Sequence, residues 1–159
     1  MRITITAADA ARGELGVPEI AAAVAPVPPV GGTPALDFQR ADGTGGTLAD
    51  YHGRYTVVHF WASWCGHCKQ DLPALRQLQD RFAARGLVTL SLSLDDDAAT
   101  WQMAVKRLDL PWQQGRLAAA STASVSSVPA YWLLDDAGKI IAKAHYPNDL
   151  APFLADRLK

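Results

Sequence analysis

The sequence contains few of the residues on which several classes of protein depend. Its 159 residues include only two cysteines, which excludes a scaffold held by several disulfides. Charged residues make up 19% of the chain and the formal net charge is −1, so a strongly basic surface for nucleic acid is excluded. No apolar run reaches the roughly 18 residues that a transmembrane helix needs. These absences leave a globular chain whose chemistry depends on a few side chains.

The N-terminal part of the chain differs from the rest. It lacks the apolar stretch of a secretory signal peptide, so any membrane attachment would require an anchor outside the given chain. Ala25–Pro34 is rich in proline and glycine, which is typical of linkers. We therefore expect residues 1–34 to form a tail or linker, in which Arg2–Thr6 could pair as an edge strand. Residues 35–159 are expected to form one domain.

From residue 35 onward, patterns typical of strands and helices alternate, which predicts an α/β fold with a central sheet and helices on both faces. The expected strands are Ala35–Gly43, Thr56–Trp61, Val88–Leu94 and a hairpin over Ala130–His145 with its turn at Asp135–Gly138. The expected helices are Lys69–Gly86, a second one from Asp97 to Leu108, and a C-terminal one after Pro147.

The periodicities also predict which side chains are buried. In the first helix, Leu72, Leu75, Leu78 and Phe82 share one face. In Val88–Leu94, aliphatic residues alternate with small hydroxyl residues, which predicts one apolar and one polar face. In the last helix we expect Phe153 to face inward with its neighbouring leucines, Leu150, Leu154 and Leu158.

Both cysteines lie in the stretch FWASWCGHCKQDLP, at the junction of a predicted strand and a predicted helix. Cys65 opens the helix, where free backbone N–H groups and the helix dipole lower the pKa of a thiol. Cys68 follows one turn later, within reach to form or resolve a disulfide. Gly66 allows the close approach of a partner. His67, when protonated, stabilises the thiolate and makes the disulfide a better oxidant.

Three other interpretations of the cysteines compete with a redox pair. They could be inert core residues, or half of a zinc site, although no second C-x-x-C exists. The third interpretation is the peroxidatic cysteine of a peroxiredoxin. That class carries the pattern Pro-x-x-x-Thr-x-x-Cys, and in this sequence Val58 stands at the proline position and Ala62 at the threonine position. None of the other histidines shows a ligand spacing relative to the cysteines; they are His52, His59 and His145.

Several stretches of the sequence resemble the thioredoxin superfamily, and in particular its redoxin-type, TlpA/ResA-like branch. The matching pieces are PALDF from Pro34, TLADYHGRYTVVHFWASWC from Thr47, and SVPAYWLLDDAGKI from Ser127. The C-G-H-C pattern is familiar from protein disulfide isomerases. The resemblance implies a thioredoxin-like fold, in which a central mixed β-sheet has helices on both faces.

The same resemblance implies a thiol-disulfide oxidoreductase that exchanges disulfides with proteins or peptides and with an unidentified redox partner. It implies no organic cofactor and no metal, and a place of action outside the cytoplasm, in the periplasm or cell envelope. An alternative from the same superfamily is a copper carrier that uses Cys65 and Cys68, for which His145 would be a weak third ligand.

The resemblance also assigns supporting roles around the cysteines. Trp64 precedes the nucleophile, as in the family, and Pro73 stands where the family kinks its active-site helix. Pro129 matches a cis-proline that faces the two sulfurs. A cis bond there would turn the backbone of Val128 outward, where it could pair with a substrate peptide as an added strand.

His59 departs from the family pattern. Thioredoxin carries at the matching strand position a buried aspartate that accepts a proton as the second cysteine is activated. His59 could be that acceptor, tunable near neutral pH, or a hydrogen-bonded core histidine without a kinetic role. No glutamate follows Glu19, so a buried glutamate cannot serve the site from within the domain.

Overall fold

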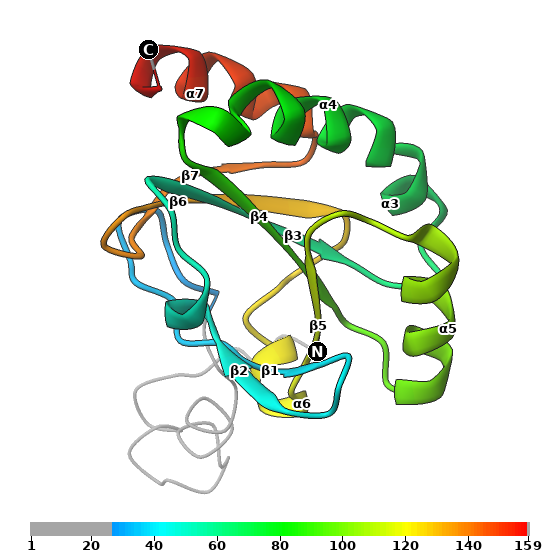
Figure 1. Cartoon of the computed structure of the whole chain (residues 1–159). Coiled ribbons are helices and arrows are strands. Elements are labelled where there is room, and N and C mark those ends of the chain that lie inside the picture. The colour runs from blue at the N-terminus through cyan, green and yellow to red at the C-terminus, as the bar shows by residue number, and fades with distance from the viewer. Residues whose placement is uncertain (1–26, 159) are drawn as a thin grey trace, which may run out of the picture.

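A seven-stranded sheet runs through the residues that this computed structural model describes, 27–158 (Figure 1). The strand order is β2-β1-β5-β4-β3-β6-β7. The strands are β1 (Asp37–Arg40), β2 (Gly45–Thr47), β3 (Tyr55–Trp61), β4 (Leu87–Ser93), β5 (Gln113–Leu117), β6 (Ala130–Asp135) and β7 (Ile140–Ala144). The edge strand expected at Arg2–Thr6 lies outside the described residues.

The sheet is mixed, as predicted, because the interior strand β3 runs parallel to β4 and antiparallel to β6. The register pairs Trp61 at the end of β3 with Ser93 at the end of β4. The carboxyl ends of these two parallel strands therefore meet at one edge of the sheet. Strands β6 and β7 form the expected hairpin, and Gly138 in its turn has a φ of 83°, a conformation that favours glycine.

Helices cover both faces of the sheet, which confirms the thioredoxin-like architecture (Figure 1). The longer ones α4, α5 and α7 lie on one face, and the short α6 and η1 lie on the other. The α-helices are α3 (Gly66–Gln70), α4 (Leu72–Phe82), α5 (Ala98–Leu108), α6 (Ala119–Thr122) and α7 (Ala151–Arg157). The 3-10 helices are η1 (Leu48–Asp50), η2 (Ala83–Arg85) and η3 (Pro147–Leu150).

Both faces of the central strands are buried. Leu90 and Leu92 of β4 face the cluster under η1, and the predicted apolar side of the strand is confirmed. The other side carries the small hydroxyl residues as predicted, and it is also buried because α4 and α5 cover it. Its side chains are Thr89, Ser91 and Ser93.

The predicted helix from Lys69 to Gly86 is divided by a break at Asp71. Asp71 ends α3 and precedes α4, and Pro73 lies in the first turn of α4, where its missing N–H costs little. The apolar face of α4 is buried as predicted, against α7 and the sheet. Gly86 ends the segment with a φ of 104°, so it acts as the expected C-terminal cap.

One buried side chain was predicted wrongly in the last helix. Phe153 of α7 is 39% exposed and its ring lies under the guanidinium of Arg157, with Cζ 5.4 Å from the ring centroid. The leucines of the same segment are buried as expected, and they are Leu150, Leu154 and Leu158. Among residues 27–158, no helix has both the length and the apolar character that crossing a bilayer requires.

The lead-in to the domain contacts the sheet through its backbone. Gly31 donates its N–H to the carbonyl of Ile140 at 2.7 Å, and Ile140 donates to the carbonyl of Gly32 at 2.9 Å. The side chain of Lys143 also donates to the carbonyl of Pro28. The division of the chain into residues 1–34 and 35–159 stays a prediction.

Candidate functional site

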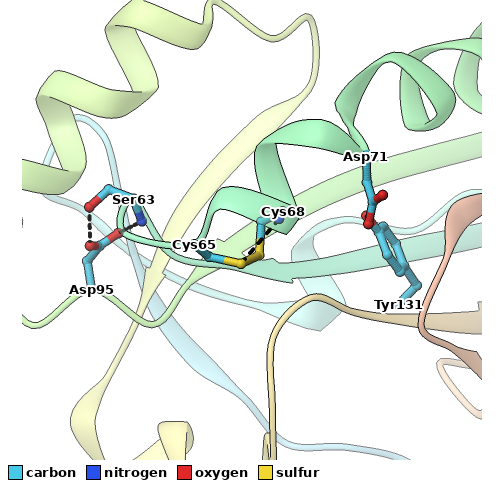
Figure 2. Close-up of a disulfide and its surroundings, with 6 residues drawn as sticks. All are labelled: Ser63, Cys65, Cys68, Asp71, Asp95 and Tyr131. Carbon is cyan, nitrogen blue, oxygen red and sulfur yellow. Dashed lines mark hydrogen bonds between the residues drawn. A yellow bond between two sulfur atoms is a disulfide. The ribbon is translucent and has the colours of Figure 1, made fainter.

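The two cysteines lie where β3 passes into α3. Cys65 is the N-cap of α3, and its N–H donates to the carbonyl of Ala62 at 3.0 Å, which closes a tight turn after the strand. Cys65 and Cys68 form a disulfide, with their Cα atoms 5.3 Å apart (Figure 2). The N–H of Cys68 donates to Sγ of Cys65 at 3.2 Å. In the reduced protein, a donor in that place would stabilise a Cys65 thiolate.

The two cysteine residues differ in their exposure to solvent. Cys65 is 7% exposed and Cys68 is 1% exposed. Both belong to an apolar cluster with Trp61 and Trp101, in which α5 packs against the end of β3. Solvent-borne reagents therefore meet Cys65 first, and Cys68 is shielded by the protein.

The residues beside the cysteines lie at the surface. Trp64 is 70% exposed, so it is not a core tryptophan. Gly66 and His67 begin α3 and are also exposed. A Cβ at Gly66 would meet no atom within 4 Å, so this glycine leaves open space next to Cys65.

The peptide bond between Val128 and Pro129 is cis, as predicted. Val128 packs against the apolar cluster that holds both cysteines. A groove of about 240 Å³ lies here, and we call it the Pro129 groove. It is lined by His67, Ser127, Val128, Pro129, His145 and Tyr146. It connects the N-terminal end of α3 with the end of β7, and Tyr146 on its rim is 61% exposed.

His59 is buried in the middle of β3. Its Nδ1 lies 2.8 Å from the hydroxyl of Ser91, which also accepts a hydrogen bond from Nε1 of Trp112 at 2.8 Å. Its ring stacks on Tyr131, with the ring centroids 5.1 Å apart. Burial lowers the pKa of His59 to about 3. The imidazole is therefore neutral at physiological pH.

With this pKa the protonated ring is a stronger acid than an ordinary imidazolium, so at neutral pH His59 would hold a proton only briefly. The surroundings of His59 therefore favour the second of the two expectations, a hydrogen-bonded core histidine. A kinetic role for His59 stays a prediction.

Two acidic side chains near the cysteines were missed by the sequence analysis (Figure 2). Asp71 lies 3.3 Å from the hydroxyl of Tyr131, whose pKa is raised mainly by burial. Asp95 is buried and bonded to Ser63 in the turn before Cys65. The expected helix start at Asp97 is confirmed, because Asp97 is the N-cap of α5, but the role of Asp95 two residues earlier was not foreseen. The signal that could have identified Asp95 was a carboxylate just after β4, the strand parallel to β3, because the carboxyl ends of parallel strands share one edge of the sheet.

The alternative of a copper carrier finds no support. Among residues 27–158, no group of three or more histidine, cysteine, aspartate or glutamate side chains could hold a metal ion. His145 lies in the Pro129 groove with His67 and is separated in sequence from both cysteines.

The chain is similar to proteins of known function and of known structure. The chain is 26% identical over 99 residues to the thiol-disulfide oxidoreductase ResA of Bacillus cereus, a match that covers 60% of this chain and 57% of that protein. It is 25% identical over 116 residues to the ResA of Geobacillus thermodenitrificans, covering 69% of this chain and 66% of that one. The chain thus spans less than two thirds of the length of these proteins.

The fold matches that of a solved thioredoxin domain of a thiol-disulfide oxidoreductase from Bacteroides vulgatus. The TM-score is 0.73 at 25% identity, and the match covers 82% of this chain and 99% of that domain. The model of the AhpC/TSA family matches residues 31–143, which include both cysteines, the cis-proline and every strand of the sheet except the last residue of β7. On that match over most of its length, the chain belongs to the AhpC/TSA family, within the thioredoxin superfamily.

Proposed function

We propose that this protein is a thiol-disulfide oxidoreductase that exchanges disulfides with protein or peptide substrates through Cys65 and Cys68. The observation that carries the proposal is the asymmetry of the pair. Cys65 is the more accessible sulfur and receives the N–H of Cys68, whereas Cys68 is shielded one turn further along α3. Only Cys65 is placed to attack a substrate, and only Cys68 is placed to attack Cys65.

The reaction needs no further reagent. The Cys65 thiolate attacks one sulfur of a substrate disulfide, and the other sulfur leaves as a thiolate that takes up a proton. The Cys68 thiolate then attacks Sγ of Cys65, expels the remaining substrate sulfur and closes the Cys65–Cys68 bond. Two electrons pass from the protein to the substrate. The reverse sequence oxidises a substrate dithiol, and the reduction potentials of the two partners decide the direction.

The Pro129 groove supports a polypeptide as the substrate. The groove runs beside the backbone of Val128, which could pair with an extended segment while a substrate cysteine meets Cys65. Exposed aromatic surface is available from Trp64, which precedes Cys65, and from Tyr146 on the rim of the groove. We also infer, from the TlpA/ResA resemblance, that the protein acts in the periplasm or cell envelope.

A comparison of two substrates tests the proposed function. The reduced protein should reduce both a small disulfide, such as hydroxyethyl disulfide, and a peptide disulfide. Absence of any exchange with the small disulfide would overturn the assignment as an oxidoreductase. Exchange with the small disulfide alone would leave the chemistry standing and overturn the polypeptide substrate.

Replacing Tyr146 tests the role of the groove. We expect Tyr146→Ala to lower kcat/KM for the peptide by about fivefold, because the loss of an exposed aromatic contact typically costs about 1 kcal/mol. Exchange with hydroxyethyl disulfide should not change. Phe153→Ala is the matched control, since it removes an exposed aromatic ring of α7 that does not line the groove. Equal losses in the two variants would remove the groove from the proposal.

Replacing His67 tests how the pair is tuned. The imidazolium favours the thiolate form and therefore the reduced pair, so His67→Pro should lower the reduction potential, on the order of 50 mV. Proline is tolerated in the first turn of a helix, so α3 should form normally. The measurement is the equilibrium of the protein with glutathione buffers of known ratio. An unchanged potential would show that His67 plays no part in tuning.

A further inference from the structure

Asp95 lies two residues after the end of β4, and its carboxylate points to Ser63 in the turn that follows β3 (Figure 2). One carboxylate oxygen accepts the N–H of Ser63 at 3.0 Å, and the other accepts the hydroxyl of Ser63 at 2.6 Å. Asp95 also accepts a hydrogen bond from the hydroxyl of Ser93, which in turn accepts the N–H of Asp95 at 2.8 Å. The carboxylate is thus buried but fully engaged, at the edge where β3 and β4 end together.

Ser63 is the residue that these bonds hold, and it lies inside the turn that presents Cys65. That turn is closed by the N–H of Cys65 and the carbonyl of Ala62. On its other side, the N–H of Leu94 donates to the carbonyl of Trp61 at 2.8 Å, so the ladder between the strands extends to the turn. Asp95 therefore ties the residue two positions before the attacking sulfur to a rigid strand end.

From these contacts we infer that Asp95 is a positioning residue for the exchange reaction, acting on Cys65 through Ser63. The inference rests on the proposed function, because what is positioned is the sulfur that attacks. A turn held at its centre keeps Sγ of Cys65 within reach of the N–H of Cys68, now 3.2 Å away. When that bond is weakened, the thiolate loses a donor and the pKa of Cys65 rises.

Charge alone would act in the opposite direction. A carboxylate near a thiol disfavours the thiolate, so removing the charge would lower the pKa of Cys65. Loss of positioning therefore raises the pKa of Cys65, whereas loss of the charge lowers it. The direction of the shift shows which of the two effects operates.

The experiment measures the rate of Cys65 alkylation by iodoacetamide against pH in the reduced protein. For Asp95→Ala we expect alkylation at pH 7 to slow by about tenfold, and the midpoint of the profile to move to higher pH. Ser63→Ala keeps the carboxylate and loses one of the two bonds, so it should shift the profile in the same direction by less. Asp95→Asn keeps an oxygen that can accept from Ser63 and should restore part of the rate.

Asp97→Ala is the matched control. Asp97 accepts the N–H of Thr100 at 2.9 Å and its hydroxyl at 2.6 Å, the same pair of bonds, but at the start of α5 rather than in the turn before Cys65. It should lower thermal stability and leave the alkylation profile unchanged.

Three outcomes would overturn the inference. An unchanged profile in Asp95→Ala, with a loss of stability like that of Asp97→Ala, would show a structural role only. A profile that moves to lower pH in Asp95→Asn, with no change in Ser63→Ala, would show an effect of charge. If Asp95→Ala does not fold, Ser63→Ala decides, and an unchanged profile there overturns the inference. Alkylation does not require a substrate disulfide, so failure of the proposed function is recognised separately, by absent exchange in the wild type.

Discussion

Cys65→Ser should reduce no disulfide above the uncatalysed rate, with either a small or a peptide substrate. The substitution removes the attacking sulfur, which is the more exposed one and the one that receives the N–H of Cys68. A serine hydroxyl in the same place has no accessible anionic form near neutral pH, so it cannot replace the thiolate. The measurement is the rate of thiol release from hydroxyethyl disulfide by the pre-reduced variant.

Cys68→Ser should behave differently, because it leaves the attack intact and removes the resolving step. The mixed disulfide between Cys65 and the substrate then accumulates in a ratio of about one to one, visible by intact mass without reductant. The double variant Cys65→Ser/Cys68→Ser is the control and should form no adduct.

The outcome that contradicts this assignment is a reversal of the two variants. An adduct trapped by Cys65→Ser would mean that Cys68 attacks first, against the order of exposure of the two sulfurs. Full turnover by either single variant would mean that the dithiol is not the reactive group.

The position of the cysteines could be predicted from sequence because it depends on local patterns. A β-branched and aromatic strand ending at Trp61 and an apolar helical period starting at Leu72 place Cys65 at a strand-to-helix junction, and the structure has it there. The cis bond before Pro129 could be predicted only from the family resemblance, since only about 5–6% of the bonds that precede a proline are cis.

The contact of Asp95 with Ser63 could not be predicted in the same way. The two residues are 32 positions apart, and they meet only because the register of β3 and β4 pairs Trp61 with Ser93. That register depends on how two segments distant in sequence pair so that their side chains reach the correct face of the sheet, which no local period encodes. Acidic residues between a strand and a helix are also typical of a helix N-terminus, and Asp97 does form the N-cap of α5.

Strand β5 was missed for a related reason. Its sequence, QQGRL, has no apolar alternation, and glycine is depleted in strands. In the structure Gly115 is needed for packing, since a Cβ there would lie 2.5 Å from a ring carbon of Phe38 and 2.9 Å from a methyl carbon of Leu92. A glycine that reads as a break in the sequence thus allows the sheet to pack closely against an aromatic ring.

Lowering the pH should destabilise this protein through His59 before its carboxylates are protonated. The pKa of His59 falls from 6.5 to about 3 on folding, because burial disfavours the charged ring. Below pH 6.5 the unfolded chain binds a proton that the folded one does not, so the folded state loses stability as the pH falls toward 3. The slope approaches about 1.4 kcal/mol per pH unit well below pH 6.5, which gives a loss of about 2 kcal/mol between pH 6.5 and 4.5. Above pH 6.5 this contribution is constant.

Urea unfolding at several pH values measures the effect, and His59→Leu isolates it. The leucine variant has no group to protonate there, so its free energy of unfolding should fall by about 2 kcal/mol less than that of the wild type over the same range. Ser91 would keep its bond from Trp112, which limits the cost of the substitution at pH 7. His52→Leu, at an exposed histidine, is the control and should follow the wild type.

The same variant decides between the two roles considered for His59. If the ring is a neutral core histidine, His59→Leu should lose the acid sensitivity and keep the rate at which Cys68 resolves the mixed disulfide. If it accepts the proton of Cys68, that rate should fall at neutral pH, where general-base assistance typically contributes about 10²-fold or more. A wild-type protein with no loss of stability between pH 6.5 and 4.5 would show that His59 is protonated in the folded state, and the burial argument would then be wrong.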